Sequence, residues 1–263
     1  TEELIELSRV AARTGGVYAT HMRDEETFVL EAVAEALRIA REAPIRLQIS
    51  HLKIGFAVNW PKLGPLMDML EKARAEGLDF RCDRYPYIAG ATSLSTLFPV
   101  WAREGGTEGL LARLGDPAFD ARLRAHLAGQ EKGYGSWEKI LISDVASDKN
   151  RALEGMNVLE AAAGAAKAPY EFMRDLLIEE SDRVGMVSFY GHEDNLKRIL
   201  SHPLVGIGAD SEAVAPYGPL SQGKPHPRTY GTFPRALGRY VREEKLVPLE
   251  ERIRKMTAMP TDR

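Results

Sequence analysis

The sequence has little of several features that define whole classes of protein. It contains one cysteine, Cys82, so no disulfide can form within the chain, and a reducing compartment such as the cytoplasm is predicted. No apolar run approaches the roughly 18 residues of a membrane-spanning helix. The net charge of −3 provides no basic surface for a nucleic-acid backbone. We therefore expect neither a membrane nor a nucleic-acid partner, while the oligomeric state stays unknown.

What the sequence does contain is ordinary for a globular protein. Of its 263 residues 44% are hydrophobic and 28% are charged, enough to form a core without disulfides. The chain begins with Thr1 inside a predicted helix and not with a methionine, so we expect further residues upstream.

Apolar periodicity predicts alternating helices and strands in the first third of the chain. Helical spacing occurs at residues 1–16, 25–43 and 60–77, and short apolar runs at 17–21, 45–51 and 78–87 read as strands. The runs end near His21, His51 and Asp83, with spacings of 51 − 21 = 30 and 83 − 51 = 32 residues. Such spacings are typical of repeated β–α units in a barrel or an open parallel sheet.

The alternation stops at about residue 88, and residues 88–182 read as an insertion. This region has short helical segments and a single strand candidate, "KILISD". Regular alternation is predicted to resume with the strand "RVGMVSFY", the helix "EDNLKRILSH" and the strand "LVGIGAD". A loop rich in proline and glycine then leads to two closing helices.

Three of the predicted strands end on groups that can bind a metal or transfer a proton: His21, His51 and Asp210. In α/β barrels, side chains at the carboxyl ends of the strands point into the catalytic mouth. Two imidazoles and a carboxylate suit zinc. The pattern therefore predicts a metal site, although each histidine could also simply cap its strand.

Six segments resemble the N-acyl-D-amino-acid deacylases (D-aminoacylases) of the amidohydrolase superfamily. They are "ATHMRDE", "ISHLK", "DRYPYIAGAT", "GHEDN", "HPLVGIGAD" and "HPRTYGTFPRALGRYVRE". The resemblance implies an α/β fold, the metal-dependent-hydrolase (β/α)8 TIM-type barrel. Residues 1–263 would form a partial barrel domain, its later part, with 88–182 inserted. The family's first barrel strands, with a His-x-His pair and a bridging cysteine, and its flanking β-sandwich have no counterpart in the chain.

The resemblance also implies roles for individual residues. His21 and His51 would hold zinc, with Asp210 beside the metal as a ligand and as general base, then acid. Lys53, Tyr85 and Arg228 fall on the family's substrate-binding positions.

The sequence departs from the family at one substrate contact. A serine of the family is replaced by Ala91, next to Thr92. Cys82 lies away from the position of the family's metal-binding cysteine, so that role is not assigned to it.

These assignments predict an enzyme that uses Zn²⁺ to hydrolyse the amide bond of N-acyl-D-amino acids. Zinc lowers the pKa of bound water towards about 7, which supplies hydroxide at neutral pH. Two alternatives stay open: a cyclic-amide hydrolase of the hydantoinase or dihydroorotase kind, and a non-catalytic metal-binding barrel fragment. We expect the chain alone to be inactive. The acyl group, the preferred D-side chain and the number of metal ions are not determined by the sequence.

Overall fold

The computed structural model describes residues 1–262 and divides the chain into two compact units. The first unit contains residues 1–88, 191–212 and 227–263, and the second contains residues 89–190 and 213–226. The sequence predicts an insertion at 88–182, and residues 89–182 fall within the second unit.

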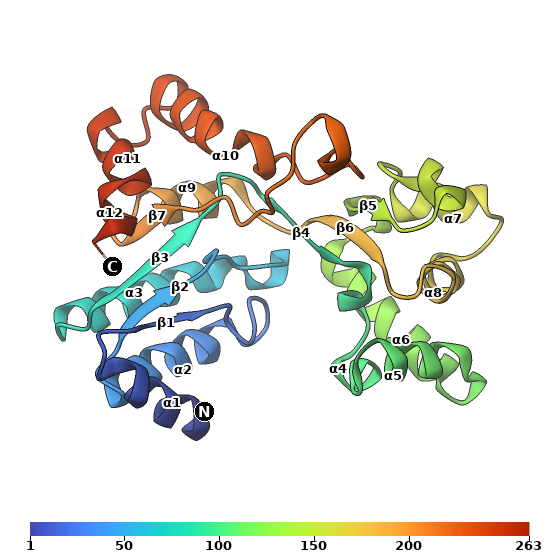
Figure 1. Ribbon diagram of the computed structural model, residues 1–263, viewed down its shortest axis with the longest axis horizontal. Coiled ribbons are helices and arrows are strands. Elements are labelled where there is room, and N and C mark those ends of the chain that lie inside the picture. The colour runs from blue at the N-terminus through green and yellow to red at the C-terminus, as the bar shows by residue number, and fades with distance from the viewer. Residues whose placement is uncertain (263) are drawn as a thin grey trace. The chain divides into compact units, whose positions relative to one another are not determined.

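The first unit is built on four parallel strands in the order β1-β2-β3-β7 (Figure 1). The strands are β1 (Val17–Thr20), β2 (Arg46–Ile49), β3 (Phe80–Arg84) and β7 (Val205–Ile207). Its helices are α1 (Glu2–Ala12), α2 (Val29–Glu42), α3 (Leu63–Ala75), α9 (Glu193–Ser201), α10 (Arg228–Leu237), α11 (Leu249–Met256) and α12 (Ala258–Thr261). The predicted α/β alternation is confirmed here.

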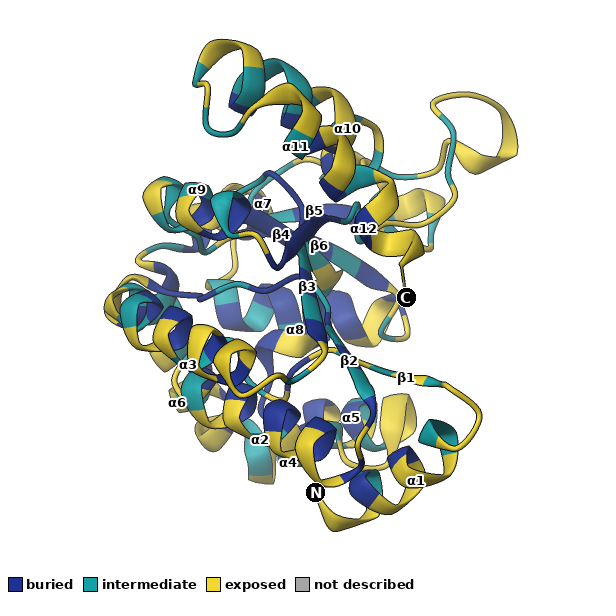
Figure 2. Ribbon diagram, turned by 90° about the vertical axis from the view of Figure 1, so that its left-hand side faces the viewer, coloured by how far each residue is buried: buried dark blue, intermediate teal, exposed yellow. Residues whose placement is uncertain are grey.

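Helices α2 and α3 pack on this sheet through apolar residues spaced three and four apart. The core that they share with the strands includes Val33, Leu37, Leu47, Ile49, Leu66, Leu70, Phe80 and Val205. Figure 2 shows that both helices carry exposed as well as buried residues, as expected for helices that cover one face of a sheet. Because each helix connects two parallel strands, the carboxyl ends of the strands lie at the same edge.

The second unit contains a three-stranded antiparallel sheet in the order β4-β6-β5. The strands are β4 (Ala89–Ser93), β5 (Ile140–Val145) and β6 (Val184–Phe189). The helices are α4 (Val100–Arg103), α5 (Gly106–Gly115), α6 (Pro117–Tyr134), α7 (Val158–Gly164) and α8 (Pro169–Glu179).

One predicted strand forms, but it belongs to a different sheet from the one expected. The segment "RVGMVSFY" forms β6, which pairs antiparallel with β4 and β5 and does not join the parallel sheet. A short buried apolar run has the same sequence pattern in both kinds of sheet, so its partners could not be read from the sequence. In the parallel sheet, β7 takes the place beside β3.

Among residues 1–262 we find no helix whose length and apolar character would let it span a lipid bilayer.

Candidate metal and substrate site

The candidate site lies at the carboxyl edge of the parallel sheet. His21 follows β1 directly, His51 comes two residues after β2, Tyr85 follows β3 and Asp210 comes three residues after β7. The register places the ends of β1 and β2 side by side, because Thr20 pairs with Ile49. This is the edge at which parallel α/β folds hold their ligands.

The structure brings His21 and His51 into contact. The Nδ1 atom of His21 faces the Nε2 atom of His51 at short range. The two ring centroids are 4.4 Å apart with an interplanar angle of 45°. Two imidazole nitrogens that face each other from neighbouring strands form a donor pair of the type that zinc prefers.

Asp83 fixes the backbone that carries His51. His51 has φ +40°, in the left-handed region that non-glycine residues seldom adopt. Its backbone N–H donates to Asp83 Oδ1 at 2.9 Å, and the Gln48 side-chain amide donates to Asp83 Oδ2 at 2.7 Å. The backbone N–H of Leu52 donates to the Asp83 carbonyl oxygen at 2.9 Å. These bonds hold the turn in which His51 leaves β2.

Glu25 links His51 to Lys53. Its Oε1 lies 2.8 Å from His51 Nδ1 and 2.5 Å from Lys53 Nζ. Burial alone would raise the pKa of Glu25, but the Lys53 charge and the bonds to His51 and Lys53 outweigh it, so the pKa falls below its usual value. Glu25 is therefore held as a carboxylate. Lys53, predicted to contact substrate, has its ammonium group engaged within the protein.

Asp210 and Arg228 form the second part of the site. Arg228 Nη1 and Asp210 Oδ2 are 2.6 Å apart, and the arginine side chain is 9% exposed. Asp210 has φ +49°, so it too lies in the left-handed region. The guanidinium of Arg228 lies over the ring of Tyr85 at 4.6 Å from its centroid, and that of Arg84 lies at 4.0 Å. The tyrosine is 1% exposed.

The predicted residues thus fall into two contact groups. In the first, His21 contacts His51, and Glu25 joins His51 to Lys53. Asp210, Arg228 and Tyr85 form the other group. Within residues 1–262, no three histidine, cysteine or acidic side chains are arranged so that they could hold one metal ion. The convergence of His21, His51 and Asp210 expected from the sequence is therefore not seen in this structure.

Glu26, next to Glu25 in the chain, has a pKa that is shifted in the other direction. Burial, with the nearby charges of Asp24 and Glu25, raises the pKa of Glu26 to about 7, against a smaller lowering by Lys53. The pKa values of two adjacent glutamates thus shift in opposite directions. The Lys53 charge and the hydrogen bonds from His51 and Lys53 outweigh burial at Glu25, whereas burial and the neighbouring carboxylates dominate at Glu26.

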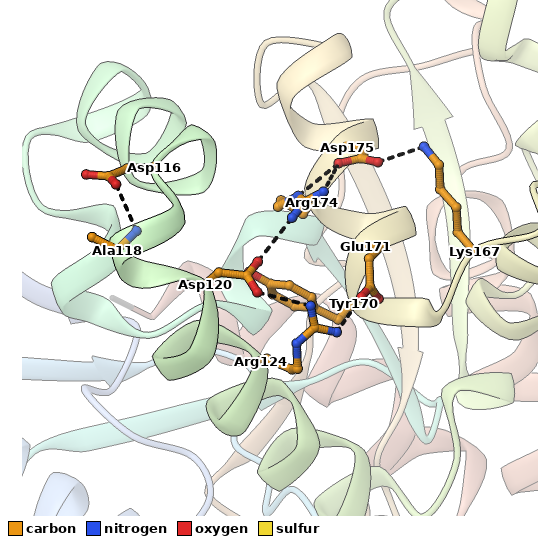
Figure 3. A network of polar contacts seen from close by, with 9 residues as sticks. All are labelled: Asp116, Ala118, Asp120, Arg124, Lys167, Tyr170, Glu171, Arg174 and Asp175. Carbon is orange, nitrogen blue, oxygen red and sulfur yellow. Dashed lines mark hydrogen bonds and ion pairs between the residues drawn. The ribbon is translucent and has the colours of Figure 1, made fainter.

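The second unit holds a dense polar network of another kind (Figure 3). Asp120 accepts a hydrogen bond from the Tyr170 hydroxyl at 2.9 Å and pairs with Arg174 at 3.1 Å and Arg124 at 3.0 Å. Arg174 also pairs with Asp175 at 2.7 Å. The charged groups lie on α6 and α8 and are between about a quarter and a half exposed, whereas Tyr170 on α8 is buried. They neutralise one another at the surface and show no arrangement suited to catalysis.

Sequence reasoning missed two residues that build the site. The closeness of Glu25 to His21 in the sequence predicts only support of the metal site, and Asp83 only marks the end of a strand. For Asp83 a signal was present, because an acidic residue at the end of the strand next to β2 can accept the unpaired N–H groups of the neighbouring turn. Ala91, which replaces a serine of the family, and the adjacent Thr92 lie in β4 of the second unit.

Comparison with known proteins finds relatives along the whole chain. A D-aminoacylase of Alcaligenes xylosoxydans xylosoxydans is 32% identical over 263 residues, which are 100% of this chain and 44% of the relative. No family model matches the chain. The chain thus spans less than half the length of the curated relatives that it matches.

Solved structures of such deacylases also match nearly the whole of this chain and less than half of their own. An N-acyl-D-glutamate deacylase from Bordetella bronchiseptica, in complex with zinc and a phosphonate mimic of the tetrahedral intermediate, is 28% identical with a TM-score of 0.75. It is matched over 99% of this chain and 45% of its own. A D-aminoacylase with a binuclear metal centre is 31% identical with a TM-score of 0.72, over 99% of this chain and 44% of its own.

Proposed function

The chain is homologous over its whole length to a part of the N-acyl-D-amino-acid deacylases, which confirms the resemblance of its motifs, and on that premise we propose a function. The protein that contains this chain hydrolyses the amide bond of N-acyl-D-amino acids to a carboxylate and a free D-amino acid. The observation that carries the proposal is the contact between His21 and His51 at the ends of neighbouring parallel strands.

His21 and His51 are the proposed zinc ligands, and Asp210 is the proposed third one. The donor set fits, because both histidines present a ring nitrogen to the same space from adjacent strands. Asp210 is paired with Arg228 in this structure. Zinc, when bound, would supply a water of lowered pKa as nucleophile at neutral pH.

The side chains of this chain would handle the proton and the substrate. Asp210 would take a proton from the attacking water at its carboxylate and deliver it to the departing amine nitrogen. Arg228 offers a planar pair of donors to the substrate carboxylate. The Tyr85 phenol would donate to the carbonyl oxygen, where one such donor is often worth ~3 kcal/mol. Lys53 would add positive charge near the substrate.

The four parallel strands are proposed to be part of a (β/α)8 barrel. Their all-parallel order with helical connections supports this, as do the TM-scores with the solved deacylases. The single buried Cys82 supports the prediction that the protein works in the reducing cytoplasm.

The function is tested by assaying the protein that contains this chain with N-acetyl-D-amino acids, their L-enantiomers and a hydantoin. We expect turnover of the D-substrates. Asp210→Asn should lower kcat by at least about 100-fold, while His21 and His51 keep zinc bound. Asparagine also tolerates the left-handed backbone at this position.

Three outcomes would contradict the proposal. Turnover of the hydantoin alone would favour a cyclic-amide hydrolase, and zinc binding without turnover of any substrate would favour a non-catalytic metal protein. An unchanged kcat for Asp210→Asn would remove the proton-transfer role. We further expect no turnover by residues 1–263 alone, since the described residues hold no three-ligand group.

A further inference from the structure

We propose that Glu25 is a positioning residue of the metal site: it holds the His51 imidazole in the tautomer whose Nε2 is free to bind a metal. This inference rests on the proposed function and gives Glu25 a specific task at one ring nitrogen of His51.

The two ring nitrogens of His51 have different surroundings. Its Nε2 faces His21, whereas its Nδ1 lies 2.8 Å from Glu25 Oε1 and 2.7 Å from Lys53 Nζ. A neutral imidazole carries one N–H and one lone pair. A metal at Nε2 requires the lone pair there, so the proton must be on Nδ1 and must find an acceptor. Glu25 Oε1 is positioned to be that acceptor.

Lys53 would favour the opposite tautomer if Glu25 were absent. An ammonium group can only donate hydrogen bonds. Beside Nδ1 it would donate to a lone pair on that nitrogen, and the imidazole proton would then move to Nε2. A proton on Nε2 would point towards His21 and block the metal position.

The carboxylate of Glu25 resolves this conflict by accepting from both donors. Its Oε1 accepts a hydrogen bond from Lys53 Nζ at 2.5 Å and lies within hydrogen-bond distance of His51 Nδ1. The side chains are 8% exposed for His51, 14% for Lys53 and 22% for Glu25, so water has little room to replace the carboxylate. A carboxylate that orients a metal-binding histidine commonly contributes 10- to 100-fold in metal affinity.

The test compares variants of the protein that contains this chain by two readouts other than activity. The first is the zinc dissociation constant, measured by competition with a chromophoric chelator. The second is the ¹⁵N chemical shift of the His51 ring in the zinc-free protein, which separates the two tautomers. For Glu25→Ala we expect zinc affinity to fall about 10- to 100-fold and the proton to move from Nδ1 to Nε2.

A double variant isolates the contribution of Lys53. In Glu25→Ala/Lys53→Met the ammonium no longer competes for Nδ1, so zinc affinity should recover most of what Glu25→Ala lost. The matched control is Glu26→Gln, the adjacent carboxyl, which is not among the groups contacting His51 in the described part of the chain. Its zinc affinity and its His51 tautomer should equal those of the parent.

Unchanged zinc affinity and tautomer in Glu25→Ala would overturn the inference while leaving the proposed function in place. A double variant as weak as Glu25→Ala would overturn the part given to Lys53. If Glu25→Ala does not fold, Glu25→Gln keeps the side-chain volume and should shift both readouts in the same direction. A parent protein that binds no zinc would refute the proposed function, and the inference with it.

Discussion

The two units of the chain use charged side chains in different ways. In the first unit the polar groups gather at the carboxyl edge of the parallel sheet, where His51 and Asp210 both have left-handed backbones. In the second unit they lie between helices α6 and α8, or anchor the loop that follows β5. Parallel strands end at one edge, whereas antiparallel strands end at alternate edges. Only the first arrangement concentrates reactive groups of several strands in one place.

The largest difference is expected from replacing histidines in the two units. His51→Asn removes the imidazole but keeps a residue that tolerates φ +40°. We expect zinc binding to be lost and activity to fall at least about 100-fold, with little change in the free energy of unfolding. Zinc content by elemental analysis and steady-state kinetics measure this. His126→Asn in the second unit is the control, and an equal loss of zinc there would show that the comparison is wrong.

Replacing Glu180 in the second unit should lower the stability of the protein and leave its zinc content unchanged. Glu180 is 2% exposed, and its carboxylate accepts from the backbone N–H groups of Ala146 and Ser147, from the Ser147 hydroxyl and from the Asn150 amide. Glu180→Ala would leave these donors unpaired, so the free energy of unfolding should fall by about 3 kcal/mol. Denaturation of the full protein, followed by hydrogen exchange at residues 145–150, measures it.

The pH dependence of this loss has a definite sign. Burial alone would raise the pKa of Glu180, but the hydrogen bonds from Ser147, Asn150 and Ala146 hold the pKa below its usual value. The stabilisation is therefore present above pH 4.5 and is lost as the pH falls through the lowered pKa. Glu179→Ala, at an exposed neighbour paired with Lys149, should change stability by no more than about 0.5 kcal/mol. Equal effects at both positions would contradict the anchoring role.

In the first unit, replacing Glu26 should have the opposite effect and raise the free energy of unfolding. A carboxyl whose pKa rises from 4.5 to about 7 costs the folded state up to about 3 kcal/mol once ionised, and partial exposure reduces this to about 2 kcal/mol. The cost is absent below pH 4.5, grows between pH 4.5 and 7 and is complete above it. Glu26→Gln should therefore stabilise the protein at pH 8 but not at pH 4. A gain of equal size at both pH values would show that burial of the charge is not its cause.

The smallest effect is expected in the surface network of Figure 3. Arg174 pairs with Asp120 and Asp175, and its side chain is 27% exposed. Exposed ion pairs contribute little, so Arg174→Ala should lower the free energy of unfolding by about 0.5 kcal/mol. Chemical denaturation measures this, with Arg174→Lys as the conservative control. A loss above about 2 kcal/mol would mean that the network organises the second unit as Glu180 does.

The periodicity of the sequence was sufficient to predict the parallel β–α units. Buried residues of α2 at helical spacing, such as Val33 and Leu37, meet buried strand residues such as Leu47. It failed for β6, because an apolar run does not specify its partner strand or direction. Residues 88–182 are predicted to hold short helical segments and one strand, whereas the unit that includes residues 89–182 contains a three-stranded sheet.

Part of the candidate site could be predicted from the sequence, because the same periodicity locates the ends of the strands. Strand ends were marked by His21, His51 and Asp210, and the first two do meet. The pairing of Asp210 with Arg228 joins residues separated by a loop of proline and glycine, and no spacing rule gives such a contact. The bond between Glu25 and Lys53 likewise connects two loops, and their sequence separation of 28 carries no periodic signal.

The sequence by itself determined the α/β alternation of the first unit and the residue types at the strand ends, because burial imposes a period on apolar residues and parallel strands present their last residues at a common edge. Only the tertiary structure decided how those residues are held. The left-handed turn at His51 depends on the carboxylate of Asp83, and the two donors beside Glu25 converge on one oxygen. Hydrogen bonds between loops depend on positions in space to within a fraction of an ångström, and no local pattern in a chain encodes them.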